Sequence, residues 1–158
     1  FRLPFREESF DIVYSIGVLH HTPNTESAFH AISRYLKTGG TIAIWVYDRW
    51  NWSRRRSLSA LASLRKVTTK LSPDTLYYLT SLAIVLYYIY KIPFVRSLQR
   101  YLPISKNSNW KRRWLDTFDL YHPKYQWVHT YPEVYRWFRG KFSDIELLDE
   151  PLSIRATR

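Results

Sequence analysis

The sequence predicts an α/β fold with a parallel sheet, and three features in its first third support this. Residues 10–19 (FDIVYSIGVL) are dense in Ile and Val without polar alternation, which is typical of a strand buried on both faces. Residues 24–38 carry helix-start signals and apolar side chains three and four apart, with Gly39-Gly40 as the expected helix end. Residues 41–47 (TIAIWVY) form a second uncharged, β-branched run. Strand, helix and strand with short connections indicate a right-handed βαβ unit.

The C-terminal part predicts one further helix and two strands. Thr130 and Glu133 match a capping box, and Gly140 ends the apolar helix pattern that follows them. The runs FSDIELLDE and PLSIRATR are separated by a tight connection. We therefore expect an antiparallel strand pair to complete the sheet.

Composition limits the class of protein. The chain has 158 residues, enough for one domain of ordinary size, and it contains neither Cys nor Met. The absence of Cys excludes disulfides and thiol catalysis and fits a reducing, cytoplasmic location. Because the chain starts at Phe1 without an initiator Met, we expect it to be a fragment.

The net charge of +11 is concentrated in the middle of the chain. Residues 48–140 hold 17 Lys and Arg against 5 Asp and Glu. This segment is expected to face an anionic partner or surface. It starts with a predicted basic amphipathic helix (residues 49–66) and continues with 15 uncharged residues from Leu76 to Tyr90. As a helix that stretch spans about 22 Å, too short to cross a bilayer, so we expect a buried or interfacial helix. Residues 101–124 are basic, aromatic and interrupted by Pro, and the sequence does not predict regular structure throughout them.

The residues after the first predicted strand are the candidate functional site. In open parallel sheets, ligands bind beyond the carboxyl ends of the strands. Gly17 either allows a ligand to approach the backbone or meets a packing requirement. His20 and His21 are not expected to chelate one metal ion, because neighbours on a strand point to opposite faces. One of them is a candidate general base, while a purely structural role for both remains the alternative.

The motifs LPF, SFD, VLHH and LK-x-GG occur in this order and spacing between Leu3 and Tyr47. As a set they resemble the later half of a class I S-adenosylmethionine-dependent methyltransferase of the type that includes the quinone-biosynthesis enzymes. Thr38 stands where that family usually has Pro. The resemblance implies a partial Rossmann-like sheet, with the Gly-rich turn and acidic residue of the cofactor site lying upstream of Phe1. It implies that the bound cofactor is S-adenosylmethionine.

The same resemblance implies a set of site residues. It implies that six residues contact the cofactor. Those near the adenine are Leu3, Pro4 and Phe5, and those at the methionine end are Ser15, Ile16 and Gly17. Ser15 as an ordinary packed strand residue is the competing interpretation. The acceptor is expected to meet side chains from the segment that folds back over the pocket: His122, Tyr125 and His129.

Methyltransferases of this superfamily often carry a substrate-covering insertion, and residues 48–129 fit that description. We expect residues 1–47 to form the later half of the cofactor-binding core, residues 48–129 a helical lid, and residues 130–158 the end of the core. Clusters of Arg and Lys interleaved with Trp suit a phosphate-bearing or membrane-embedded acceptor at an anionic membrane surface. The leading hypothesis is a methyltransferase of a small-molecule or lipid-linked acceptor. A nucleic-acid methyltransferase, a non-catalytic binding module and a merely solvated basic face are the alternatives.

Overall fold

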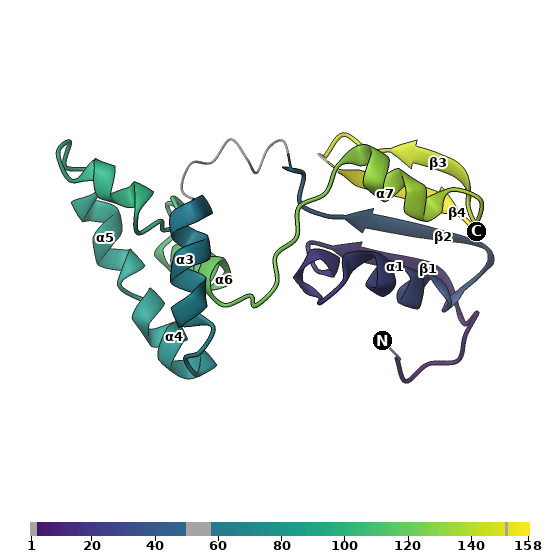
Figure 1. The fold of residues 1–158 in the computed structure, drawn as a ribbon, viewed down its shortest axis with the longest axis horizontal. Coiled ribbons are helices and arrows are strands. Elements are labelled where there is room, and N and C mark those ends of the chain that lie inside the picture. Colours follow the sequence, from purple (N-terminus) through teal and green to yellow (C-terminus); the bar gives the residue numbers. More distant parts are fainter. Residues whose placement is uncertain (1–2, 50–57, 151) are drawn as a thin grey trace. The chain divides into compact units, whose positions relative to one another are not determined.

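The computed structural model describes residues 3–49, 58–150 and 152–158 (Figure 1). These residues form two compact units. Unit 1 contains the described residues before position 50 and those from Tyr125 onward, and unit 2 contains those from Leu58 to Lys124. The sequence predicted an insertion at 48–129, and within the described residues unit 2 runs from 58 to 124. Whether the insertion acts as a lid stays a prediction.

Unit 1 is a four-stranded mixed sheet with two helices. Its strands follow the order β1-β2-β4-β3, and β1 and β2 are parallel while β4 is antiparallel to both of its neighbours. The elements are β1 (Phe10–Ile16), the short 3-10 helix η1 (Leu19–His21), α1 (Thr25–Ser33), β2 (Leu36–Trp45), α7 (Tyr131–Phe138), β3 (Ser143–Leu147) and β4 (Ser153–Thr157). The predicted α/β class, the βαβ unit and the antiparallel finish are confirmed.

The core of unit 1 lies on the face of the sheet that α1 and α7 cover. Ile42 and Ile44 of β2 are almost completely buried there, and so is Ile154 of β4. From the helices, Phe29 packs its ring 4.6 Å from that of Phe138. The period-2 alternation of the strands therefore directs one set of apolar side chains into a single core.

The opposite face of the sheet is open within the described residues, which corrects the expectation that the first strand is buried on both faces. Ile12, Tyr14 and Ile16 of β1 are 67%, 71% and 65% exposed. On this face Tyr14 of β1 pairs with Ala43 of β2, which in turn pairs with Arg155 of β4. Arg155 forms an ion pair with Glu146 of β3. The open face is thus apolar along β1 and charged along β4 and β3. Hydrophobic composition identified the strand, but it could not show how many of its faces the chain itself covers.

Gly39-Gly40 does not end a helix, which is a second correction. Helix α1 ends at Ser33, and both glycines lie inside β2. Phe10 pairs with Leu36 but Ile12 pairs with Thr41, so the β1–β2 register shifts between these pairs. The extra residues of β2, which include both glycines, form a bulge. Gly39 has φ +79°, and a Cβ on Gly40 would lie 2.8 Å from the Leu36 side chain. Glycine is therefore required by the strand irregularity.

Unit 2 is helical. It contains α3 (Leu58–Thr68), α4 (Pro73–Thr80), α5 (Ala83–Ile89), the 3-10 helix η2 (Arg96–Arg100) and α6 (Trp110–Tyr121). Helix α6 contacts α3, α4 and α5 and so holds the unit together. Its Tyr121 hydroxyl donates to the Pro103 carbonyl at 2.7 Å, and its Trp114 indole donates to the Tyr77 carbonyl at the same distance. None of the described helices combines the length and the apolar character that spanning a bilayer requires.

The uncharged stretch from Leu76 to Tyr90 is two helices, and it is buried on one side only: Leu76, Thr80, Ala83 and Tyr90 are buried, whereas seven of its fifteen residues are exposed. Ser81 separates α4 from α5, and its hydroxyl donates to the Tyr78 carbonyl at 2.6 Å, competing with the helical hydrogen bonds. Helix α6 gives residues 110–121 the regular structure that the sequence did not predict. Asn109 caps it, because its side chain accepts from the amides of Lys111 and Arg112. Of the predicted basic helix, residues 50–57 lie outside the described residues.

Candidate functional site at the carboxyl ends of β1 and β2

The chain turns immediately beyond β1 and β2, at the edge where parallel strands place ligand sites. Strand β1 stops at Ile16, and His20 and His21 lie in η1. The argument that strand neighbours point to opposite faces was therefore wrong for this pair, because a 3-10 turn sets their ring centroids only 4.3 Å apart. Within the described part of the chain, no group of three or more His, Cys, Asp or Glu is placed to hold a metal ion.

His20 is completely buried. Its ring stacks on Tyr47, with centroids 3.8 Å apart, and neither ring nitrogen has a hydrogen-bond partner among the described residues. Burial, with smaller contributions from His21 and His129, lowers the pKa of His20 to about 3. His20 is consequently a neutral, packed ring at neutral pH, the structural role that the sequence left open.

His21 differs from its neighbour in both exposure and hydrogen bonding. It is partly exposed, and its Nδ1 lies 2.9 Å from the Tyr125 carbonyl oxygen. Because a carbonyl can only accept, Nδ1 carries the proton in this contact, and the Nε2 of a neutral ring is then the free acceptor. Of the two predicted bases, His21 is the one whose geometry leaves a nitrogen able to take a proton.

Residues 125–129 cross the carboxyl ends of β1 and β2 and are tied to them by backbone hydrogen bonds. The Trp127 amide donates to the His20 carbonyl and the His129 amide to the Tyr47 carbonyl, each at 2.9 Å. The Trp127 indole also donates to the Thr22 carbonyl at 3.0 Å. The sequence did not predict a role for Tyr47 or Trp127, although the position of Tyr47 at the end of the predicted strand 41–47 was a usable signal.

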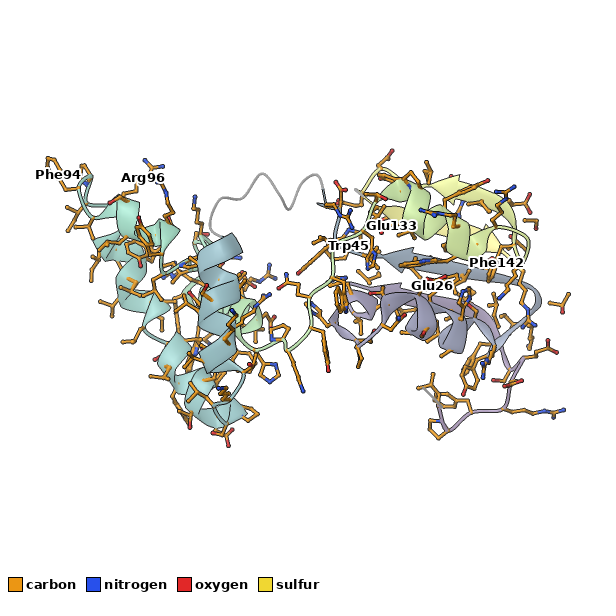
Figure 2. All side chains as sticks on the ribbon, in the orientation of Figure 1. Glu26, Trp45, Phe94, Arg96, Glu133 and Phe142 are labelled. Atoms are coloured by element: carbon orange, nitrogen blue, oxygen red, sulfur yellow. The ribbon has the colours of Figure 1, made fainter. Side chains whose placement is uncertain are left out.

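A cavity of about 420 Å³ lies beside this crossing segment, at the start of α1. His129 lines it together with Thr25, Glu26, Trp127 and Glu133. The His129 Nε2 is 3.0 Å from the Thr25 hydroxyl, and burial is the main cause of a lowered pKa at His129. Figure 2 shows Glu26 on α1 and Glu133 on α7, two acidic side chains of this cavity.

The predicted cofactor residues divide between the two ends of β1. Ser15 is half-buried, Ile16 is exposed on the open face, and the Gly17 amide donates to the Trp45 carbonyl at 3.0 Å. Gly17 has φ +71°, and a Cβ there would lie 2.9 Å from the Trp45 ring. Packing against Trp45 is therefore sufficient to explain this glycine.

Leu3, Pro4 and Phe5 lie at the amino end of β1. The Leu3 amide donates to the Tyr35 hydroxyl at 2.8 Å, and the Phe5 ring packs edge-on against Phe10, the first residue of the strand. The six steps from Phe10 to Ile16 separate the two groups by about 20 Å. The structure therefore does not bring them together into one compact set.

The predicted acceptor residues also divide. Tyr125 and His129 belong to unit 1 and to the crossing segment. His122 belongs to unit 2, where it follows α6 and stacks on Phe118 with ring centroids 4.7 Å apart. The structure brings Tyr125 next to His21 through its carbonyl oxygen, while a role of these residues toward an acceptor stays a prediction.

The beginning of the chain matches a family of known domains. Residues 1–44 match the family model described as a methyltransferase domain. This segment, 44 of the 158 residues, is similar to the methyltransferase domain family. The match confirms the resemblance drawn from the LPF, SFD and VLHH motifs, and the methyltransferase segment so defined contains β1, η1, α1 and most of β2.

Individual relatives agree with the family assignment. The chain is 41% identical over 56 residues to a probable tRNA methyltransferase 9B of Mus musculus, covering 34% of this chain and 12% of that protein. It is 34% identical over 61 residues to the sterol 24-C-methyltransferase ERG6B of Gibberella zeae, covering 35% and 16% respectively. A probable tRNA methyltransferase 9B of Homo sapiens is 44% identical over 48 residues, covering 28% and 11%. The chain thus spans less than a fifth of the length of each of these relatives.

Proposed function

We propose that this chain is part of an S-adenosylmethionine-dependent methyltransferase that acts on a small-molecule or lipid-linked acceptor. The single observation that carries the proposal is the match of residues 1–44 to a methyltransferase domain. The parallel β1–β2 pair with a site at its carboxyl ends supports it physically, because that edge is where α/β sheets bind nucleotide-like cofactors.

The described residues fit part of this cofactor. S-adenosylmethionine supplies an activated methyl group on a sulfonium. Exposed Ile16 at the carboxyl end of β1 offers an apolar surface, and the neighbouring half-buried Ser15 offers a hydroxyl. Neither is a carboxylate, the group that holds ribose hydroxyls in comparable sites, and as strand neighbours they point to opposite faces, so they would contact only part of the cofactor from the end of β1.

His21 is the proposed base for an acceptor that must lose a proton. Its Nδ1 donation to the Tyr125 carbonyl fixes the ring and leaves Nε2 unprotonated in the neutral form. His20 does not serve, because its ring is completely buried and stacked on Tyr47. Its role in this proposal is to hold the turn in which His21 lies.

Unit 2 is proposed to contact an anionic membrane surface. Tyr78 of α4 and Val85 of α5 are 69% and 57% exposed, and Leu82 between the two helices is 58% exposed. Phe94 is 93% exposed, and Figure 2 shows it at one end of this unit. No acidic residue occurs from Thr75 to Leu115, whereas seven Lys and Arg do. Exposed apolar side chains among uncompensated cations are typical of proteins that bind anionic membrane surfaces.

Transfer of a radioactive methyl group tests the proposal and distinguishes acceptor classes. The protein is incubated with S-adenosyl-[methyl-³H]methionine and a total cell extract, and the label is partitioned into organic solvent or precipitated with acid. We expect organic-soluble counts. Nuclease-sensitive, acid-precipitable counts would instead favour an RNA acceptor, the class named for two of the relatives. Absence of cofactor binding by calorimetry would favour the non-catalytic binding module.

A matched pair of variants tests the base. In His21→Asn, the side-chain amide retains a donor for the Tyr125 carbonyl but loses the basic Nε2. We expect transfer to fall by about 100- to 10,000-fold. His30→Asn makes the same change on α1, at a residue outside the cavity lining, and should retain most of the activity. Equal activity of both variants would refute the role of His21.

A further inference from the structure

Unit 2 contains a second cavity, separate from the site at β1 and β2, whose lining is cationic and aromatic. It encloses about 400 Å³, within the range of ligand-sized pockets. Its lining consists of Tyr87, Tyr90, Lys91, Arg96, Gln99, Ile104 and Lys106. Three of these seven side chains are cations and none is an acid, so the cavity has a positive potential.

The cations of this cavity have no carboxylate partner among the described residues. Lys91, Arg96 and Lys106 form no ion pair there. Asp116, the nearest acid in the sequence, accepts from the Ser105 hydroxyl at 2.9 Å and does not line the cavity. The positive charge around the cavity is therefore left to solvent or to an anion.

Tyr87 is the centre of this arrangement. The Lys91 ammonium lies 4.8 Å from the centroid of its ring, and the Arg113 guanidinium carbon lies 3.8 Å from the same centroid. Both distances are within the range of cation–π contacts. One aromatic wall of the cavity thus carries two positive charges.

Arg113, which contacts the Tyr87 ring, adds a further positive charge close to the cavity. It is completely buried, and its Nη1 donates to the carbonyls of Asn107 and Ser108, the residues that follow Lys106, at 2.7 and 3.3 Å. Its Nε and Nη2 have no partner in the described residues. A buried guanidinium without a carboxylate is costly unless an anion nearby compensates it.

We propose that the cavity lined by Tyr87, Lys91, Arg96 and Lys106 is a binding site for a phosphate monoester with an apolar carrier group. A phosphate monoester carries nearly two negative charges at neutral pH and accepts several hydrogen bonds, which suits a cavity lined by three cations. The cavity is larger than a phosphate group, and Tyr87, Tyr90 and Ile104 offer apolar surface for the carrier. The site does not depend on methyl transfer.

Binding of hexyl phosphate to the whole protein, measured by calorimetry without any methyl donor, tests the proposal. Hexanol and inorganic phosphate show what the phosphate and the carrier each contribute. We expect saturable binding that Arg96→Glu and Lys106→Glu each weaken by about 10- to 100-fold. Arg100→Glu makes the same charge change in η2, outside the lining, and should alter the affinity by less than about twofold.

Two outcomes overturn the proposal. One is the absence of saturable hexyl phosphate binding to a folded protein, and the other is equal weakening by all three variants, which indicates diffuse electrostatics. Circular dichroism verifies that each variant is folded. If a charge-reversal variant is not folded, the corresponding neutral variant, Arg96→Gln or Lys106→Gln, is used instead.

A competition experiment identifies the source of the phosphate. Vesicles of phosphatidylcholine with phosphatidic acid are bound first, and hexyl phosphate is then added. Release of the protein from the vesicles shows that the site takes a lipid headgroup. Retention on the vesicles, together with binding of dissolved hexyl phosphate, shows that it takes a soluble ester. Either result supports the phosphate site. If no phosphate monoester binds there, the proposed methyl transfer is unaffected, because it rests on other residues.

Discussion

Acidification from pH 7.5 to 5.0 should destabilise unit 1 through His20. The pKa of this ring is about 3 in the folded protein, against an ordinary value of 6.5, because the ring is buried. Between these values the unfolded chain binds a proton that the folded chain does not, so His20 favours the folded state above pH 6.5 and loses this contribution as the pH falls. At about 1.36 kcal/mol per pH unit over some 1.5 units, the loss at pH 5.0 is about 2 kcal/mol.

The measurement compares wild type with His20→Phe, in which the stack on Tyr47 keeps an aromatic ring but nothing titrates. Urea unfolding at both pH values gives four free energies, and any constant packing cost of Phe cancels within each variant. His21 and His129 also face this ring, and both are present in the wild type and in His20→Phe. The contribution of His20 is therefore the difference between the pH dependences of the two proteins. Hydrogen exchange at the β2 amides assigns the effect to unit 1.

His122→Phe is the control, because that ring is exposed and belongs to unit 2. The reasoning is refuted if wild type and His20→Phe lose the same stability between the two pH values. That result would mean that His20 takes up its proton equally in the folded and unfolded chain.

Three further changes test other parts of the structure. Gly17→Ala should cost about 1 to 3 kcal/mol more than Gly39→Ala in thermal unfolding, because both have positive φ but only a Cβ at position 17 meets the Trp45 ring; equal melting temperatures would contradict the packing argument. Glu133→Ala should lower stability by about 1 kcal/mol, since its carboxylate accepts the Thr130 amide at 2.8 Å, with Glu133→Gln as the variant that retains an acceptor. Vesicle sedimentation should weaken in Leu82→Glu and at high salt, and binding unaffected by both would argue against a membrane surface.

The sequence predicted the elements whose signals are local. The Ile- and Val-rich runs, the helix start at Asn24 and the Thr130–Glu133 capping box all occur as expected. The errors came from features with two physical meanings. Gly39-Gly40 serves a strand bulge instead of a helix end, and the uncharged run after Leu76 contains hydroxyl side chains that divide it into two helices.

The candidate site was predictable in position but not in the division of roles. The carboxyl end of β1 followed from the parallel sheet, and the two histidines followed from their place after it. What separates His20 from His21 is contact with Tyr47 and with the Tyr125 carbonyl, residues 27 and 104 positions away from their partners. No local pattern encodes such contacts, since the fold alone brings them together.

The hydrogen bonds between residues 47–49 and 129 make the long middle segment of the chain a replaceable module. The Arg49 amide donates to the His129 carbonyl at 2.8 Å, so the chain leaves unit 1 and returns to it at one point that unit 1 itself holds closed. Inserted domains are tolerated where their two ends meet in this way. Exchange of everything between Arg49 and Tyr125 for another helical segment, or for a short linker, would leave the sheet and both its helices intact. Such a scaffold can take up a different module by recombination, without altering a single residue that packs in the core of unit 1.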